Sequence, residues 1–244
     1  MVVKKNFFIG TAFCLLALVA SAFLLDAVGL ATVFRTSRRM SGFSLDSKHY
    51  IYLESSRNQI TEVPTAQIQI IDVANNSCVS NGCLKTEYDR SALNITNQAA
   101  EDDLLQKTVS LRQRLRLNRL KVGRNLPILV RSISSRNSDT VQVRLTEQTP
   151  PLQIQLQQRA LPSNLSGGTS DVDRTSMRLV VDYQYRRLTI GKLNDYRDAV
   201  KKYAIREVRL SPNERNLVVL IDMTQPTYTG VLQTTLVQSF PIWQ

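Results

Sequence analysis

Alternation of apolar and polar residues is the feature that most constrains how this chain can fold. The segments "DTVQVRLTE" (139–147) and "PLQIQLQQ" (151–158) each carry a run with an apolar residue at every second position. Successive side chains of a strand point to opposite faces, so both segments predict strands with one buried and one solvated face. Pro150 and Pro151, in the loop between them, favour a hairpin.

Further segments are typical of strands because β-branched, aromatic and alternating residues are frequent in them. They are 49–55, 66–73, 126–134, 177–190, 204–210, 216–223 and 229–243. The run from Leu217 to Ile221 is apolar at every position rather than at alternate ones. Such a run predicts a central strand that is covered on both faces.

Two segments have helical spacing instead. From Asn97, which can cap a helix, apolar and small residues recur every three or four positions, and this predicts a helix over 98–116. Three acids, Glu101, Asp102 and Asp103, fall in its first turns, where the helix dipole favours them. A second, short helix is expected after Asn194, since Tyr196, Ala199, Val200 and Tyr203 would share one face.

The expected fold class is therefore mainly β or α+β: an antiparallel sheet or sandwich-like domain with two helices, preceded by one N-terminal transmembrane helix. The β-rich domain covers residues 49–244, and the polar stretch 161–176 is a possible internal boundary. No internal repeat is evident from the sequence.

The transmembrane prediction rests on "FFIGTAFCLLALVASAFLL" (7–25), a stretch without a charged residue. At about 1.5 Å per residue, a helix of this length crosses a hydrocarbon core of roughly 30 Å. Residues 1–34 are interpreted as a membrane anchor or signal sequence, and 35–48 as a basic juxtamembrane linker. The basic flanks are Lys4, Lys5, Arg35, Arg38 and Arg39. Cleavage after Ala22 or Ala31, which gives a secreted form, is the alternative to an uncleaved anchor.

The flanking charges nearly balance, so the positive-inside rule alone does not orient the chain. Cys78 and Cys83 lie in the polar stretch "NNSCVSNGC" (75–83) and are disulfide candidates, which requires an oxidising compartment. Two free thiols are the alternative. A metal site is not expected, because His49 is the only histidine and Cys14 lies in the apolar run. Because a disulfide between Cys78 and Cys83 requires an oxidising compartment, we expect the domain on the periplasmic side.

The charge excess of +11 comes from the flanks of the apolar run and from one central stretch. That stretch, "SLRQRLRLNRLKVGRN" (110–125), has no acidic residue. Its candidate contacts for an anionic partner are Arg112, Arg114, Arg116, Arg119, Lys121 and Arg124. The stretch is interpreted as a solvated face with cations at a helix carboxyl end, as a contact for an acidic protein, or as a contact for a membrane or envelope polymer. Nucleic acid is not expected, because no aromatic residue lies between Tyr88 and Tyr183.

Signals of catalysis are weak. No glycine-rich phosphate loop is present, His49 has no evident nucleophile to activate, and the acids are explained by helix starts and polar loops. Four tyrosines could line a sugar-stacking groove, although their spacing favours a place in the core: Tyr183, Tyr185, Tyr196 and Tyr203.

We therefore expect no catalytic residues, no cofactor, no metal and no small-molecule substrate. The predicted function is that of a membrane-anchored, single-pass extracytoplasmic binding or scaffold protein of the cell envelope. Its expected partners are membrane lipid, through the N-terminal helix, and another envelope protein. The alternatives are an enzyme that acts on an envelope polymer with carboxylates, and a tethered adaptor that faces the cytoplasm.

Overall fold

Three antiparallel sheets account for most of the computed structural model, which describes residues 32–57, 62–86, 88–89, 91–134, 138–162, 173–227 and 229–242. The helix-side sheet consists of β2 (Ser37–Phe43), β3 (His49–Arg57), β4 (Pro64–Asp72) and β5 (Ser77–Lys85). The middle sheet has the order β1 (Thr32–Arg35), β14 (Gly230–Pro241), β13 (Asn216–Thr227), β12 (Lys202–Leu210) and β6 (Arg124–Leu126). The outer sheet has the order β11 (Arg186–Arg197), β10 (Asp173–Tyr183), β9 (Leu152–Pro162), β8 (Ser138–Val143) and β7 (Ile128–Ser134).

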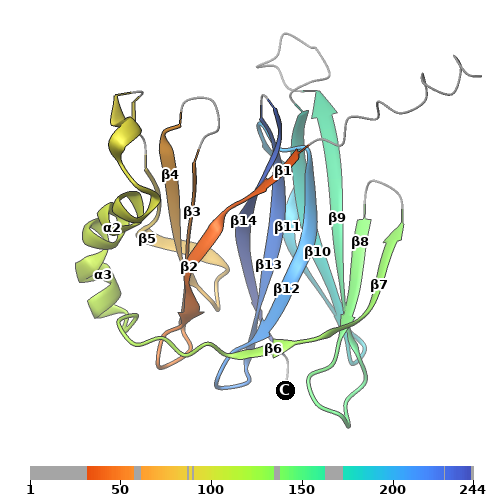
Figure 1. Cartoon of the computed structure of the whole chain (residues 1–244). Coiled ribbons are helices and arrows are strands. Elements are labelled where there is room, and N and C mark those ends of the chain that lie inside the picture. The colour runs from red at the N-terminus through yellow and green to blue at the C-terminus, as the bar shows by residue number, and fades with distance from the viewer. Residues whose placement is uncertain are drawn as a thin grey trace, which may run out of the picture. The chain divides into compact units, whose positions relative to one another are not determined.

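The sheets pack face to face because the middle sheet is apolar on both sides. On β13, Leu217, Val219 and Ile221 join the core shared with the outer sheet. The intervening residues Val218 and Leu220 pack against Tyr50, Tyr52 and other residues of the helix-side sheet. The central strand predicted from this apolar run is thereby confirmed, and Figure 1 shows the three sheets side by side.

Two α-helices, α2 (Asn97–Lys107) and α3 (Val109–Arg114), pack on the other face of the helix-side sheet, after the short 3₁₀ helix η1 (Ala92–Asn94). The single helix expected over 98–116 is wrong in its continuity. The hydroxyl of Thr108 donates to the carbonyl of Leu104 at 2.7 Å, and the backbone leaves helical geometry at this residue (ψ 7°). Thr96, rather than Asn97, caps α2, since its side chain accepts the N–H of Ala99.

The segment expected as a juxtamembrane linker is part of the domain. Residues 37–43 form β2, and residues 32–35, the first three of which were assigned to the anchor, form β1 beside β14. The apolar run 7–25 lies outside the described residues. Within the described part of the chain, no helix is both long enough and apolar enough to span a membrane.

The short helix expected after Asn194 is also wrong. Residues up to Arg197 continue β11, the chain turns at Ala199, which has a left-handed backbone (φ 56°), and β12 begins at Lys202. Pairing with β10 and β13 therefore overrides the helical spacing. The possible boundary at 161–176 does not divide the fold, since β9 and β10 on its two sides are paired neighbours.

The hairpins β2–β3 and β12–β13 have similar turns and bulges. The connecting turns carry the similar sequences "SLDSK" (44–48) and "SPNER" (211–215). Each turn is closed by a hydrogen bond of 2.9 Å from the first serine N–H to the carbonyl of the first residue of the next strand, His49 or Asn216. Each preceding strand has a bulge in which one arginine, Arg39 or Arg206, is skipped in the ladder.

Candidate functional site

The cationic stretch begins where α3 ends, in a turn that the helical pattern did not predict. Arg116 has a left-handed backbone (φ 56°), so that its N–H reaches the carbonyl of Gln113 at 3.1 Å and the N–H of Leu117 reaches that of Arg112 at 2.8 Å. This pair of bonds is the Schellman arrangement of a helix end. It turns the chain and buries Leu117, which is only 1% exposed, in the same core cluster as Leu111.

Four cations remain on the outside of this turn and of the segment that follows it. Arg114, Arg116, Arg119 and Lys121 are exposed, and we call them the cationic ridge. No carboxylate of the described residues lies within ion-pairing distance of any of the four. Two exposed apolar side chains, Val109 and Val122, lie close to the ridge in the chain, exposed by 41% and 63%.

The other two arginines of the stretch are held by the fold. The guanidinium of Arg112 folds back on α2 and donates to the carbonyl of Leu105 at 2.9 Å, and burial lowers its pKa. Arg124 donates to the carbonyl of Leu145 at 2.7 Å and lies 3.7 Å from the carboxylate of Glu214. These two residues therefore support local structure.

The three acids of α2 share two cationic partners outside the ridge. Arg39 lies 3.2 Å from Glu101 and 2.6 Å from Asp102, and Lys107 lies 2.9 Å from Asp103. None of these carboxylates forms an ion pair with a cation of the ridge.

The arginines expected as a membrane flank are part of the domain surface. Arg38 pairs with Glu207 at 3.2 Å, Arg39 pairs with the acids of α2, and Arg35 is exposed. Lys4 and Lys5 lie outside the described residues.

The ridge and β1 are far apart along the strand direction of the middle sheet. Next to β1, the backbone N–H of Thr36 donates to the carbonyl of Gln233 on β14. Just beyond the ridge, Arg124 pairs with Leu210, which pairs with Leu217, which in turn pairs with Phe240 of β14. Seven residues of strand separate Gln233 from Phe240, about 23 Å at a rise of 3.3 Å per residue. The ridge therefore does not form one basic patch with Arg35.

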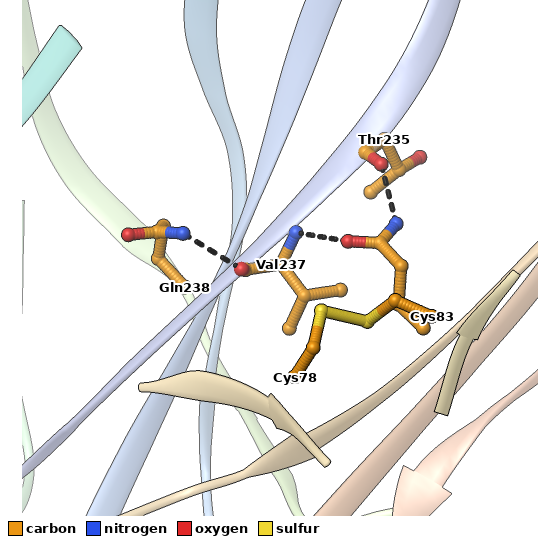
Figure 2. The surroundings of a disulfide bond; sticks show 6 residues. Cys78, Cys83, Thr235, Val237 and Gln238 are labelled. Atoms are coloured by element: carbon orange, nitrogen blue, oxygen red, sulfur yellow. Dashed lines mark hydrogen bonds between the residues drawn. A yellow bond between two sulfur atoms is a disulfide. The ribbon is translucent and has the colours of Figure 1, made fainter. Parts of the chain in front are cut away.

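The structure brings Cys78 and Cys83 to disulfide distance, with the sulfurs 2.01 Å apart. Both cysteines lie in the edge strand β5, which was expected to be a polar loop. Cys83 pairs with Gln69 and Cys78 with Ile71 of β4, so that residues 79–82 bulge opposite a single residue. Figure 2 shows the bond beside Val237 of β14, whose side chain belongs to the core cluster that Cys83 contacts.

The groups weighed for catalysis are distributed over the fold. Buried Glu101 accepts a hydrogen bond from the hydroxyl of Ser55 at 2.6 Å as well as pairing with Arg39. The Nδ1 atom of His49 is buried and has no hydrogen-bond partner among the described residues. The hydroxyl of Ser44, which accepts the backbone N–H of His49 at 3.0 Å, donates to Asp46 at 2.6 Å.

Glu54, a fully buried carboxylate, was missed by the sequence analysis. It accepts hydrogen bonds from the hydroxyl of Thr36, the amide of Gln67, and the N–H and hydroxyl of Thr235. The one available signal was an acid inside the otherwise apolar strand "YIYLES" (50–55). Since its oxygens are occupied by donors from β4 and β14, it joins two sheets.

The four tyrosines have separate environments. Tyr203 is fully buried and Tyr183 is 6% exposed, as expected of core residues. Tyr196 lies under the guanidinium of Arg174, 5.5 Å from the ring centre. Tyr185 differs from the prediction, since it is fully exposed in the β10–β11 turn.

Comparisons with known proteins give one match. Residues 56–239 match the model of the family described as "Predicted secreted protein (DUF2259)". That description agrees with the expected extracytoplasmic location and names no activity. No curated protein and no solved structure matches the chain. Since the matched residues make up more than half of the sequence, the chain belongs to this family of predicted secreted proteins.

Proposed function

We propose that this protein is an extracytoplasmic binding protein of the cell envelope, and that its cationic ridge binds an acidic surface of a partner protein. The single observation that carries the proposal is the exposure of four cations without a carboxylate partner among the described residues. Arg38, Arg39, Arg206 and Arg209 are paired with carboxylates. Other exposed cations, such as Arg159 and Lys192, have no ion pair among the described residues either, but the four of the ridge lie within one stretch of eight residues that has no acid. An acidic partner would supply the missing counter-charges.

The backbone of Arg116 supports this role. A left-handed residue costs about 1 kcal/mol or more when it has a side chain, and glycine is the residue that favours this position of a Schellman motif. The turn requires the conformation but does not use the guanidinium, which is exposed. An arginine in this place is explained by what it binds.

A protein surface accounts for the ridge better than the other anionic partners do. Within the described residues, the ridge lies far along the middle sheet from Arg35, so the two do not form one basic surface for a bilayer. Exposed Val109 and Val122 suit the mixed apolar and charged contacts of protein interfaces. Bases of a nucleic acid would need aromatic side chains to stack on, and the segment 89–182 has none.

The proposal includes the attachment expected from the sequence. Residues 7–25 would span the membrane once and leave the β-rich domain on the periplasmic side, and cleavage at Ala22 or Ala31 would release it. Support comes from the disulfide, which needs an oxidising compartment, and from the family description.

The test is cross-linking of the full chain in intact cells, followed by quantitative identification of its neighbours. One variant changes all four ridge residues to Gln. A matched control changes four other exposed cations, Arg159, Lys192, Lys201 and Lys202, to Gln and so removes the same charge. The proposal predicts an acidic protein neighbour that the ridge variant loses by about tenfold or more and the control retains. Equal recovery by both variants would contradict it, and so would a neighbour list without an acidic protein.

A further inference from the structure

Two hollows lie next to each other at the end of the β10–β11 hairpin, and neither belongs to the cationic ridge. The first has a volume of about 390 Å³ and is lined by Arg124, Thr146, Thr149, Tyr183 and Glu214, among others. The second has a volume of about 450 Å³ and is lined by Gln153, Asp182, Tyr185, Arg186 and Arg187, among others. Tyr183 and Gln184 line both, so they form a shared wall. Both are open to solvent, so they suit a ligand that lies along the surface rather than one that is enclosed.

Most charges in the hollows are paired, which distinguishes them from the ridge, and Arg186 in the second hollow is the one lining cation without an ion pair among the described residues. Arg124 lies 3.7 Å from Glu214 in the first hollow. In the second, the guanidinium of Arg187 contacts both carboxylate oxygens of Asp182, at 3.0 and 3.3 Å. Paired donors and acceptors of this kind suit a neutral ligand with adjacent hydroxyl groups, each of which donates one hydrogen bond and accepts another.

An aromatic surface stands beside these polar groups. Tyr185 is fully exposed at the tip of the hairpin, and Tyr183 keeps its ring in the wall, where its hydroxyl accepts a hydrogen bond from Gln184 at 3.2 Å. The faces of aromatic rings pack against the apolar C–H faces of sugar rings, while polar side chains bind their hydroxyls. Of the four tyrosines weighed for sugar stacking, Tyr185 is thus the one that combines an exposed ring with a place beside these polar groups.

The backbone of the hairpin gives an independent observation. Gln184 and Tyr185 both have positive φ (47° and 64°) between the paired residues Tyr183 and Arg186. Such two-residue turns strongly favour Asn-Gly, and each residue with a larger side chain costs about 1 kcal/mol. The turn therefore keeps two large side chains at the rim of the hollows at a cost to folding.

We propose that these hollows form a binding site for a neutral oligosaccharide, which stacks on Tyr185 and spans both hollows across Gln184. The site is independent of the proposed function of the ridge. It gives the domain a second, polyhydroxylated ligand of the kind that envelope glycans provide.

The experiment is saturation-transfer NMR of the full chain with four probes. Three are neutral tetrasaccharides, of β1,4-linked glucose, β1,4-linked N-acetylglucosamine and α1,4-linked glucose, and the fourth is the acidic tetramer of galacturonic acid. The decisive variant combines Gln184→Asn with Tyr185→Gly. It shortens the amide side chain at 184, removes the ring at 185 and introduces the preferred turn pair, so it should fold at least as stably as the wild type.

We expect signals from at least one neutral tetrasaccharide, and we expect the double variant to weaken its binding by about tenfold or more. Tyr185→Phe, which keeps the ring, should retain binding, and so should the ridge variant. The site is contradicted if no neutral probe binds or if the double variant binds as the wild type does. Binding of the acidic tetramer alone, lost in the ridge variant, would also contradict it and would assign the sugar to the ridge.

Discussion

The carboxylate of Glu54 on β3 accepts the backbone N–H of Thr235 on β14 at 2.7 Å, which joins the helix-side sheet to the middle sheet. Beside it, the amide of Gln69 donates to the carbonyl of Thr235 at 2.6 Å and accepts the N–H of Val237 at 3.1 Å. Figure 2 shows Thr235 and Val237 at these bonds. Side chains of one sheet thus satisfy backbone groups of another, which fixes how the two sheets pack.

Glu54→Gln should destabilise the domain because an amide nitrogen cannot accept the donors that now surround both carboxylate oxygens. Hydrogen bonds to a charged group contribute about 1.5 to 3 kcal/mol, so we expect the free energy of unfolding in urea to fall by about 2 kcal/mol. The exposed carboxylate of Glu214 provides the control, since Glu214→Gln should change it by less than about 0.5 kcal/mol. Similar effects of both substitutions would refute the role of Glu54.

The similar turns of the β2–β3 and β12–β13 hairpins allow a matched pair of substitutions. The hydroxyls of Ser44 and Ser211 are buried, and each accepts a backbone N–H at 3.0 Å and donates to a side-chain oxygen at 2.6 Å. Replacing either serine by Ala should therefore lower the free energy of unfolding near neutral pH by about 1 to 2 kcal/mol. Because the turns are in different sheets, the effects should add in the double variant.

Acid should separate these two variants. Ser44 donates to Asp46, a carboxylate, whereas Ser211 donates to the neutral amide of Asn213. Burial acts to raise the pKa of Asp46, but the hydrogen bonds from the Ser44 hydroxyl and from the N–H of Lys48 outweigh it. The net effect is a pKa below the ordinary value of 3.8. This stabilisation is present above that value and is lost as the pH falls through the lower folded pKa. The loss of unfolding free energy caused by Ser44→Ala should therefore shrink on acidification, and that caused by Ser211→Ala should not. Urea unfolding near neutral pH and at a pH below the folded pKa of Asp46 measures both losses. Equal changes in the two losses would contradict this prediction.

The disulfide should stabilise the domain by restricting the unfolded chain. A bridge between Cys78 and Cys83 closes a short loop, for which the chain-entropy relation gives about 2 kcal/mol. Replacing both cysteines by Ala should lower the free energy of unfolding by about this amount, and a reductant should then have no further effect. Alkylation of both thiols in the native wild-type protein without reductant would show that the bond does not form.

Arg116→Gly should stabilise the fold while it removes one cation of the ridge. Glycine adopts the left-handed conformation of Arg116 without the steric cost of a side chain, so the free energy of unfolding should rise by about 0.5 to 1 kcal/mol. Arg116→Ala keeps that cost and should leave stability near the wild-type value. If glycine destabilises the domain, then the Arg116 side chain contributes to folding, and its left-handed backbone no longer supports a role in binding.

The sequence predicted the strands well where a strand has its own pattern. Alternation identified β8 and β9, and the continuous run 217–221 identified β13 as covered on both faces. The first helical prediction failed in part, because Thr108 interrupts the helix. The second failed completely, because pairing with β10 and β13 set the structure of 194–203. Those events depend on contacts between distant segments, which local spacing does not contain.

The sequence identified the cations of the candidate site but not their arrangement. The six cations of the central stretch were named from the sequence, but their separation into four exposed and two fold-bound members depends on the turn at Arg116 and on the carbonyls of Leu105 and Leu145. Glu54 was missed because its partners come from strands remote in sequence. The hollows beside Tyr185 likewise combine residues of several strands and turns.

The most direct test of the ridge is site-specific photo-cross-linking in intact cells from Val122, beside the ridge, compared with Ile133 on β7. The two side chains are similarly exposed, by 63% and 61%, and differ in their surroundings. Our account predicts a discrete adduct with an acidic protein from Val122 only, which disappears when Arg114, Arg116, Arg119 and Lys121 are changed to Gln. Identical adducts from both positions, or an adduct from Val122 that survives removal of the four charges, would contradict it.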